Sequence, residues 1–453
     1  MSWIVKFRIK EYLRESTWIV PLLCAIVAAI VGTQTWRLDK YFQWNLFDFK
    51  FSGAIATVGA IIGAMITFTG FVFSILLVAV QFASAHLSPR VLKTSLNDKI
   101  TQASNGIFVS TFVYSIIIIA RIDNDFVPQL SVFIAIIMVG ISIIMFLILI
   151  NHVSLRLQAP RIIHGVAVRG IKIIEKMYSK NYSSSAKQQK QDTDILLDKP
   201  TRIITYEGIP GVVQAIDITG LINIAEKNNA LIVLAPAVGD YVSRDSHLFY
   251  LFEEDQPIKT KLLNQSVAIG IERTMQQDPA FVLRILVDIA LKAASEDQSD
   301  PTTAVMAIDK IHSLLNILAS KEIDAGEYFD QLNKLRFEMQ TPTWDDYLSL
   351  AVDEIRFAGI QFVQVVRRLR AMLEELLDTV PIELKSSVQK RLKLIDSSIE
   401  RNYVDQEDQE LAKIADYQGM GSSRKTGYRR SDDTSSNIEF EKTLLTNSNS
   451  QQE

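Results

Sequence analysis

The sequence predicts an α-helical integral membrane protein with four transmembrane helices and a cytoplasmic α+β region, in which a small β barrel-sandwich-like module precedes a helical domain. Three observations predict this class. Apolar residues crowd into the first third of the 453-residue chain, in runs long enough to cross a hydrocarbon layer about 30 Å thick. From about residue 156 onward the composition is charged and mixed, as in a soluble protein. There, short β-like runs are followed by amphipathic helical patterns.

The domain boundaries follow from these changes in composition. We expect a transmembrane domain at 1–155, an interfacial helix with a linker at 156–202, the β module at 203–260, the helical domain at 261–412 and a disordered tail at 413–453. The tail is expected to be disordered because it consists mainly of Ser, Asn, Gln, Gly and charged residues.

The membrane spans are expected in four apolar runs, at residues 17–34, 54–87, 104–121 and 131–153. The first run predicts a retained anchor and not a signal peptide, because its basic flank is long and it lacks a small-residue cleavage site. Lysine and arginine in the short flanks favour one side of the membrane by about three to one. This excess predicts that both termini are cytoplasmic.

The second run carries a stripe of small and polar residues. With the apolar Leu77 as the one exception in the series, the positions recur in steps of four and three, so they form one face of a helix with a 3.5-residue repeat. The stripe consists of Gly63, Thr67, Gly70, Ser74, Gln81, Ser84 and Ser88. An unbroken helix over 54–87 would be about 50 Å long, which exceeds the membrane, so its last turns should reach the inner headgroups or the cytoplasm.

Two interpretations of the stripe stay open. Small residues let membrane helices pack closely, and hydroxyls bond across the contact. Alternatively, copies of this helix surround an aqueous path, with Thr67, Ser74 and Gln81 facing water. Apart from Arg121 at the end of the third run, the expected spans contain no Asp, Glu, Lys or Arg, which disfavours proton relays and voltage sensing, and no inverted repeat suggests a transporter.

Two separated stretches resemble a known family. The sequences MITFTGFVFSILLVAVQFASAHLSPRVL at 65–92 and GIFVSTFVYSIIIIAR at 106–121 are similar to the membrane region of the bacterial predicted membrane proteins called domain of unknown function 2254. Residues 271–311 resemble the second signature of that family, in which a QDP and a DPTTA motif flank a helix. Family members usually read SPxxNDPTTA, whereas this chain reads SEDQSDPTTA. The resemblance, over about residues 10–400, implies a multi-pass protein of the bacterial inner membrane with a cytoplasmic domain and no established activity.

Residues 155–180 form a basic amphipathic pattern directly after the last span. This pattern fits an interfacial helix attracted to anionic lipid, and it equally fits the ordinary positive charge of a cytoplasmic flank. The β-like runs from 203 to 253 resemble biotinyl and lipoyl carrier modules, which present a lysine at a hairpin tip. No lysine occupies the corresponding tip here, so the sequence favours a structural module without carrier chemistry.

The helical domain holds the other group of candidate functional residues. Asp278 and Asp300 each precede a proline, where a carboxylate can cap a helix. The alternative is a binding site for a small ligand or cation at a helix junction, built from Arg273, Asp278, Asp288, Asp300, Thr302, Thr303 and Asp309. Their oxygen atoms suit Mg²⁺ or Ca²⁺, but their spacing matches no known cage. The nearby cluster of Arg367, Arg368 and Arg370 is expected on a solvated helix face.

The sequence offers little support for catalysis. It contains no P-loop, HExxH, GxSxG or Rossmann motif, and its five histidines are scattered. The single cysteine, Cys24, excludes an intrachain disulfide and a thiolate metal site. The net charge of −4, with interleaved signs, disfavours nucleic acid as a partner. We therefore expect no enzyme, no cofactor and no metal.

The leading hypothesis from the sequence is a homo-oligomeric, channel-like conduit for ions or small solutes. In this hypothesis the second span lines or packs around the axis, and the cytoplasmic domain assembles or gates the pathway. The alternative is a membrane-anchored sensor or interaction scaffold whose cytoplasmic domain binds a small ligand or a protein. Both hypotheses make the lipid bilayer a partner, and only the first requires other copies of the chain.

Overall fold

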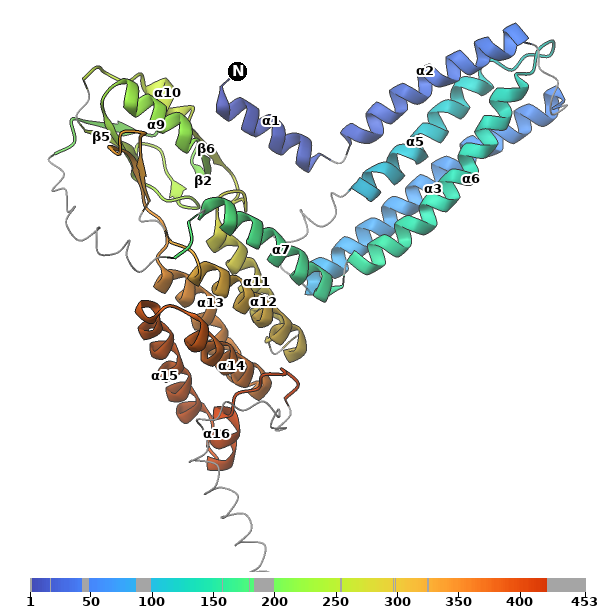
Figure 1. The fold of residues 1–453 in the computed structure, drawn as a ribbon. Helices are drawn as coiled ribbons and strands as arrows, with labels where there is room; N and C mark the ends of the chain where they lie inside the picture. The colour runs from blue at the N-terminus through green and yellow to red at the C-terminus, as the bar shows by residue number, and fades with distance from the viewer. Residues whose placement is uncertain are drawn as a thin grey trace, which may run out of the picture.

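The computed structural model describes most of the chain. The described residues are 2–16, 18–42, 49–86, 99–156, 158–178, 180–182, 199–252, 255–295, 297, 299–323 and 326–421, and for residues 14, 15, 82–86 and 156 only the backbone is described. Figure 1 shows two arms. The bundle, residues 19–156, consists of long helices drawn in blue and cyan. The C-terminal region, residues 159–421, contains strands and shorter helices.

The bundle contains four helices that are long and apolar enough to cross a membrane. They are α2 (Ile19–Phe42), α3 (Phe51–His86), α5 (Lys99–Ile119) and α6 (Gln129–Arg156). The expectation of four helices of spanning length is therefore confirmed. Helix α5 is central, because it packs against α2, α3 and α6. Phe108, Tyr114 and Ile118 of α5 are fully buried, so bulky side chains pack the interior of the bundle.

One end of the bundle, which we call the capped end, is closed by hydrogen bonds between helices. The Asp39 carboxylate, on a residue only 2% exposed, accepts hydrogen bonds from the N–H groups of Leu130 and Ser131 (3.0 and 2.9 Å) and from the Ser131 hydroxyl (2.6 Å). It thereby caps the first turn of α6, where the helix dipole favours negative charge. Gln129 also exchanges two 2.9 Å hydrogen bonds with the backbone of Phe49. The sequence pattern placed Asp39 beyond the first span, but α2 extends far enough to carry it into the bundle.

Helix α7 (Ala159–Met177) joins the two arms. Its apolar side chains, including Ile163 and Ile174, are buried in the core of the C-terminal helices. A Cβ at Gly170 would lie 2.6 Å from Val282 Cγ1, which shows how closely α7 approaches its neighbour. The apolar face of this amphipathic helix is therefore covered by protein and not by lipid, and the exposed face carries basic residues such as Arg161.

The strands form two sheets among the described residues. They are β1 (Arg202–Thr205), β2 (Gly211–Ile216), β3 (Leu231–Leu234), β4 (Tyr241–Val242), β5 (His247–Phe252), β6 (Val267–Gly270), β7 (Glu327–Phe329) and β8 (Leu335–Met339). A five-stranded sheet has the order β1-β5-β3-β8-β7, and a three-stranded sheet has the order β4-β2-β6. All pairs are antiparallel except β3 with β8. Helices α9 (Ile218–Lys227) and α10 (Thr260–Asn264) accompany them.

The prediction that only helices follow the β module is wrong. Strands β6, β7 and β8 come from that segment, and β8 pairs with β3 in parallel. The reason is burial: Ile232 of β3 is fully buried, so this strand needs neighbours on both edges, and β8 supplies one of them. The chain thus builds a small mixed sheet from distant segments, and a barrel-sandwich is not confirmed.

The remaining helices form the largest apolar core of the C-terminal region. They are α11 (Pro279–Ala293), α12 (Pro301–Ala319), α13 (Trp344–Ala358), α14 (Val363–Thr379), α15 (Lys385–Asn402) and α16 (Gln406–Lys413). Residues 414–421 follow α16 and contact α14, so the disordered tail expected from residue 413 is wrong for this part. Residues 422–453 lie outside the described residues.

Candidate functional site

The stripe of small and polar residues lies on the outward face of α3. Gly63, Thr67, Gly70, Ser74 and Gln81 are all exposed. The opposite face of the helix, with Val58 and Val72, is buried in the bundle core. The backbone of Ser84 belongs to α3, but its side chain and all of Ser88 lie outside the description.

The stripe is open to the surroundings of the bundle. A Cβ at Gly63 or Gly70 would meet no described atom of the chain within 4 Å. The Thr67 hydroxyl donates to Gly63 O (3.1 Å), and the Ser74 hydroxyl donates to Gly70 O (3.0 Å). Each hydroxyl therefore satisfies its donor on its own helix and presents its oxygen outward as an acceptor.

The outward face of α6 provides a direct contrast. It consists of apolar residues with one glycine, as lipid contact requires: Ile136, Ile137, Gly140, Ile141, Ile143, Ile144, Leu147 and Ile148. Conversely, polar residues at Ser104, Thr111 and Ser142 are buried within the bundle. Thr111 and Ser142 share a 3.0 Å hydrogen bond between α5 and α6. The exposed side of α3 thus carries a stripe of small and polar residues beside apolar ones such as Ile66 and Phe71, whereas these exposed positions of α6 are apolar or glycine.

The candidate ligand residues of the helical domain do not come together. Asp278 caps α11 by accepting from Phe281 N (2.9 Å), and Asp300 caps α12 by accepting from Thr303 N (3.1 Å). These two caps begin successive antiparallel helices, so about 20 Å of helix separates them. The capping interpretation is confirmed.

The other carboxylates of the group pair with arginines. Asp288 accepts from Arg284 (2.7 Å) on its own helix, and Asp309 accepts from Arg368 (2.6 Å) of α14. Thr302 and Thr303 lie in the first turn of α12. Among the described residues, no three His, Cys, Asp or Glu side chains are grouped so that they could hold a metal ion.

Arg273 and Asp278 form an ion pair of 2.5 Å. Burial raises the pKa of the Asp278 carboxyl, against the opposing effects of Arg273 and of the first N–H groups of α11. The Arg273 guanidinium also lies against Gly239, where φ is +96° and a Cβ would overlap it. This glycine belongs to the tight turn before β4, so Arg273 connects the sheets to α11.

The two glutamines before Asp278 extend this connection. Gln277 accepts from Ile216 N (2.8 Å) and donates to Ile216 O (3.0 Å), which fastens it to the end of β2. Gln276 donates to the carboxylate of Glu11 in α1 (Trp3–Glu15), the helix that precedes the first span. The segment 273–278, which we call the QDP junction, therefore joins α1, the sheets and α11. Figure 1 shows α1 between the strands and α2.

Comparison with known proteins identifies the family of the chain. The family described as "Predicted membrane protein (DUF2254)" matches residues 14–375, which includes all four spans and the QDP junction. The chain belongs to the DUF2254 family. The resemblance inferred from its motifs is thereby confirmed.

Similar DUF2254 relatives include an uncharacterized protein of Mycobacterium bovis and two uncharacterized proteins of Mycobacterium tuberculosis. Each is 26% identical to this chain over 427 residues, which cover 89% of this chain and 80% of the relative. No solved structure matches the chain.

Sequence reasoning missed the buried arginines of this DUF2254 chain. Arg367 and Arg368, expected on a solvated face, are only 1% and 7% exposed. Arg367 donates to Ile414 O (2.9 Å) and Gly421 O (3.2 Å), so it holds the segment that follows α16. The sequence contained one indication of this burial. Arg367 and Arg368 lie between Val366 and Leu369, which belong to the apolar face of α14 that packs into the core.

His312 shares this buried environment. Its Nδ1 lies 3.4 Å from Glu375 Oε2, and burial, with the nearby Arg368, lowers the pKa of His312 to about 4. Burial raises the pKa of Glu375. We interpret this neutral imidazole beside a carboxyl of raised pKa as a structural pair.

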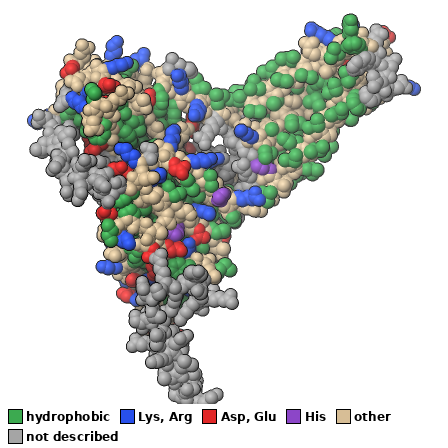
Figure 2. Space-filling model, in the orientation of Figure 1, with side chains coloured by type: hydrophobic (Ala, Val, Ile, Leu, Met, Phe, Trp, Pro, Cys, Tyr) green, Lys and Arg blue, Asp and Glu red, His purple; other side chains and the backbone are tan. Residues whose placement is uncertain are grey.

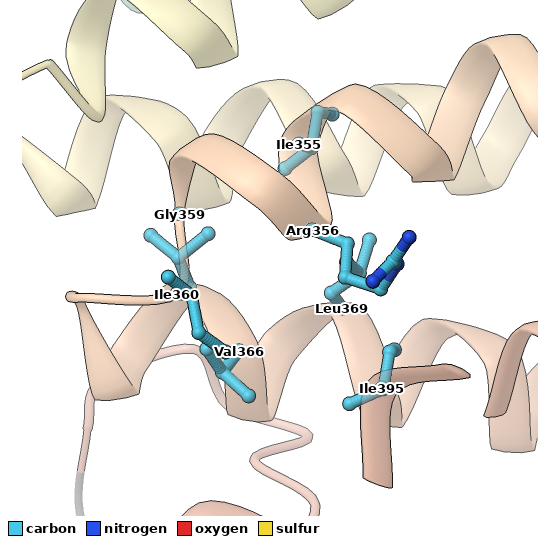
Figure 3. A pocket seen from close by; sticks show the side chains of 8 residues that line it. Ile355, Arg356, Gly359, Ile360, Val366, Leu369 and Ile395 are labelled. Atoms are coloured by element: carbon cyan, nitrogen blue, oxygen red, sulfur yellow. The ribbon is translucent and has the colours of Figure 1, made fainter. Parts of the chain in front are cut away.

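A cavity beside Arg356 is also too small for a ligand. Figure 3 shows Arg356 among apolar side chains from α13, α14 and α15, including Leu369 and Ile395. The cavity measures about 10 Å³, which admits no more than a single water molecule. Arg356 donates to Ser398 Oγ (2.5 Å) and lies 4.1 Å above the Phe357 ring, and burial lowers its pKa. Its role is therefore to join α13 to α15.

Proposed function

We propose that the protein is an oligomeric, channel-like membrane conduit in which copies of α3 meet at an axis along the stripe. The proposal rests on the stripe of small and polar residues on the outward face of α3. No other part of the described chain covers this stripe. A pathway within one subunit is not supported, because Phe108, Tyr114 and Ile118 fill its interior. A pathway for ions or small solutes would therefore run between subunits, past Thr67 and Ser74.

The proposal places the C-terminal region in the cytoplasm of a bacterial cell, at the inner membrane. Two observations support this side. The basic flanks favour it, and the contact of Gln276 with Glu11 puts the helix before the first span beside the region after the last one. The two attachments, through the QDP junction and through α7, would let the C-terminal region assemble or gate the conduit. The proposal assigns the chain no catalytic activity.

A membrane-anchored sensor or scaffold is the second candidate. The QDP junction favours it, because a change at the sheets could reach α1 and the first span through Gln277 and Gln276. It is less well supported, since the residues that would have formed its ligand site are dispersed over α11 and α12 and are engaged in caps and ion pairs.

Thiol labelling tests the conduit. Single cysteines at Thr67, Ser74 and Gln81, in a Cys24→Ser background, would be treated with a membrane-impermeant thiol reagent in intact membranes. The proposal expects labelling at these positions. Ile144→Cys and Leu147→Cys on α6 are the controls, because their neighbour Phe146 packs against Phe68 of α3 (4.7 Å), which places them at a depth similar to that of Thr67.

The controls are expected to stay unlabelled, since they face hydrocarbon. Labelling of the stripe would justify recording currents from the reconstituted protein. If Thr67→Cys and Ser74→Cys are as unreactive as the α6 controls, no water reaches the stripe and the conduit is rejected.

A further inference from the structure

A groove of about 260 Å³ runs between α3 and α6, toward the end of the bundle opposite the capped end. Helix α3 contributes Val72, Ile75, Leu76 and Ala79, and α6 contributes Leu149 and Val153. These side chains are all apolar. The groove extends from Val72 to Ala79 of α3, or about 10 Å, which is too short for a whole lipid and suitable for part of an acyl chain.

The groove exists because the packing between α3 and α6 changes along their length. Nearer the capped end, the rings of Phe68 and Phe146 pack at 4.7 Å and fill the space between the helices. Beyond this pair, Ala79 offers only a methyl group, and the interface is left unfilled. The groove lies on the surface of two membrane-spanning helices, so hydrocarbon chains are the molecules that reach it.

Positive charge lies close to the end of this groove. Ser154 of α6 belongs to its lining, and α7 begins five residues later. Arg161 and His164 are exposed in the first turns of α7, whose first turn contains no acidic residue. The N-terminus of a helix adds partial positive charge. Figure 2 shows histidine and basic side chains gathered where the bundle meets the C-terminal region.

We propose that the groove binds an acyl chain of an anionic phospholipid, whose phosphate lies against Arg161 and the first turn of α7. Charge complementarity favours this occupant over a second copy of the chain, because α3 and α6 contain no Asp or Glu that could pair with Arg161. The rigid attachment of α7 to α11 and α12 means that such a lipid also contacts the joint between the two arms. This site is independent of the proposed conduit.

Lipid retention tests the site in the full-length protein. The chain would be reconstituted in nanodiscs containing equal amounts of phosphatidylglycerol and phosphatidylcholine, released into mild detergent and weighed by native mass spectrometry. We expect one phosphatidylglycerol per chain, retained about fivefold over phosphatidylcholine, the preference that one basic residue near a membrane surface provides. Ala79→Trp should abolish retention by filling the groove, and Arg161→Gln should remove the preference but not the binding.

Matched variants make the result decisive. Ile144→Trp places the same bulk on the outward face of α6, outside the groove, and Lys172→Gln removes a basic residue about 16 Å further along the same helix. Both should retain the lipid as the wild type does. Equal retention of the two lipids by the wild type, or retention unaffected by Ala79→Trp, would overturn the proposal. Cross-linking of Ala79→Cys between copies, without retained lipid, would show that the groove is an interface instead.

Discussion

The buried arginines of the C-terminal region and the stripe on α3 are both polar groups in apolar settings, and they differ in where their partners lie. Arg367 and Arg368 find carbonyls or carboxylates within the chain at 2.6 to 3.2 Å. The hydroxyls of Thr67 and Ser74 bond only to their own helix and face outward. A polar group that the fold satisfies is structural, whereas one that the fold leaves at the surface of a spanning helix indicates a partner outside the subunit.

The largest expected effect concerns the arginines. Arg367→Met should destabilise the protein by about 3 kcal/mol, because the carbonyls of Ile414 and Gly421 lose their donor. Chemical denaturation of the purified chain measures this, and limited proteolysis should detect release of residues 414–421. Arg401→Met, at an exposed position, is the control and should change stability by less than about 0.5 kcal/mol. Equal effects of the two variants would refute a structural role for Arg367.

The next effect depends on pH. The pKa of His312 is lowered from 6.5 to about 4, so its contribution to stability is present above pH 6.5 and is lost as the pH falls toward 4. Between pH 7 and pH 5 the loss is about 2 kcal/mol. The raised pKa of Glu375 acts in the opposite direction, so the quantity to compare is the pH dependence of the wild type with that of His312→Gln. If His312 contributes nothing to this pH dependence, the curves of stability against pH for the wild type and for His312→Gln will be parallel.

A smaller loss of stability is expected when either aspartate cap is removed, and its size should differ between the two caps. Asp300→Ala should cost about 1 kcal/mol, the usual cost of losing a helix cap. Asp278→Ala should cost about 2 kcal/mol, because it also leaves Arg273 without its 2.5 Å partner. Thermal unfolding with and without added Mg²⁺ or Ca²⁺ measures both. Stabilisation by either cation that disappears in these variants would restore the ligand-site interpretation.

The last effect, on self-association and not on folding stability, is the most specific for the stripe. Gly70→Leu should weaken self-association in detergent about tenfold, or about 1.4 kcal/mol, without lowering the stability of the subunit. Gly140→Leu on α6 is the matched control, since a Cβ at Gly140 also meets no described atom within 4 Å. Analytical ultracentrifugation would compare the two. Equal association of both variants would remove the distinction between the two faces.

Sequence patterns predicted the features that depend on local chemistry. The apolar runs identified four helices of spanning length, and the Asp-Pro pairs identified the caps of α11 and α12. In both cases a few adjacent residues supply the whole physical reason. The 3.5-residue repeat likewise placed the stripe on one face of α3.

The predictions failed for features that depend on partners distant in the sequence. Strand β8 exists because β3 needs a neighbour about 100 residues away in sequence, and no local pattern encodes that pairing. Arg367 is buried because residues 414–421 cover it, and Asp39 because α6 begins beside it. The role of Gln276 and Gln277 could not be foreseen either, since their partners lie in α1 and β2.

Disulfide cross-linking of Ser74→Cys in the Cys24→Ser background tests the central claim most directly. If copies of α3 meet at an axis along the stripe, oxidation in intact membranes should give a covalent dimer, while Leu147→Cys, on the outward face of α6 and within about 10 Å of the same depth, should remain monomeric. A monomeric Ser74→Cys beside a cross-linked Leu147→Cys would show that the subunits meet through α6, and would contradict the account.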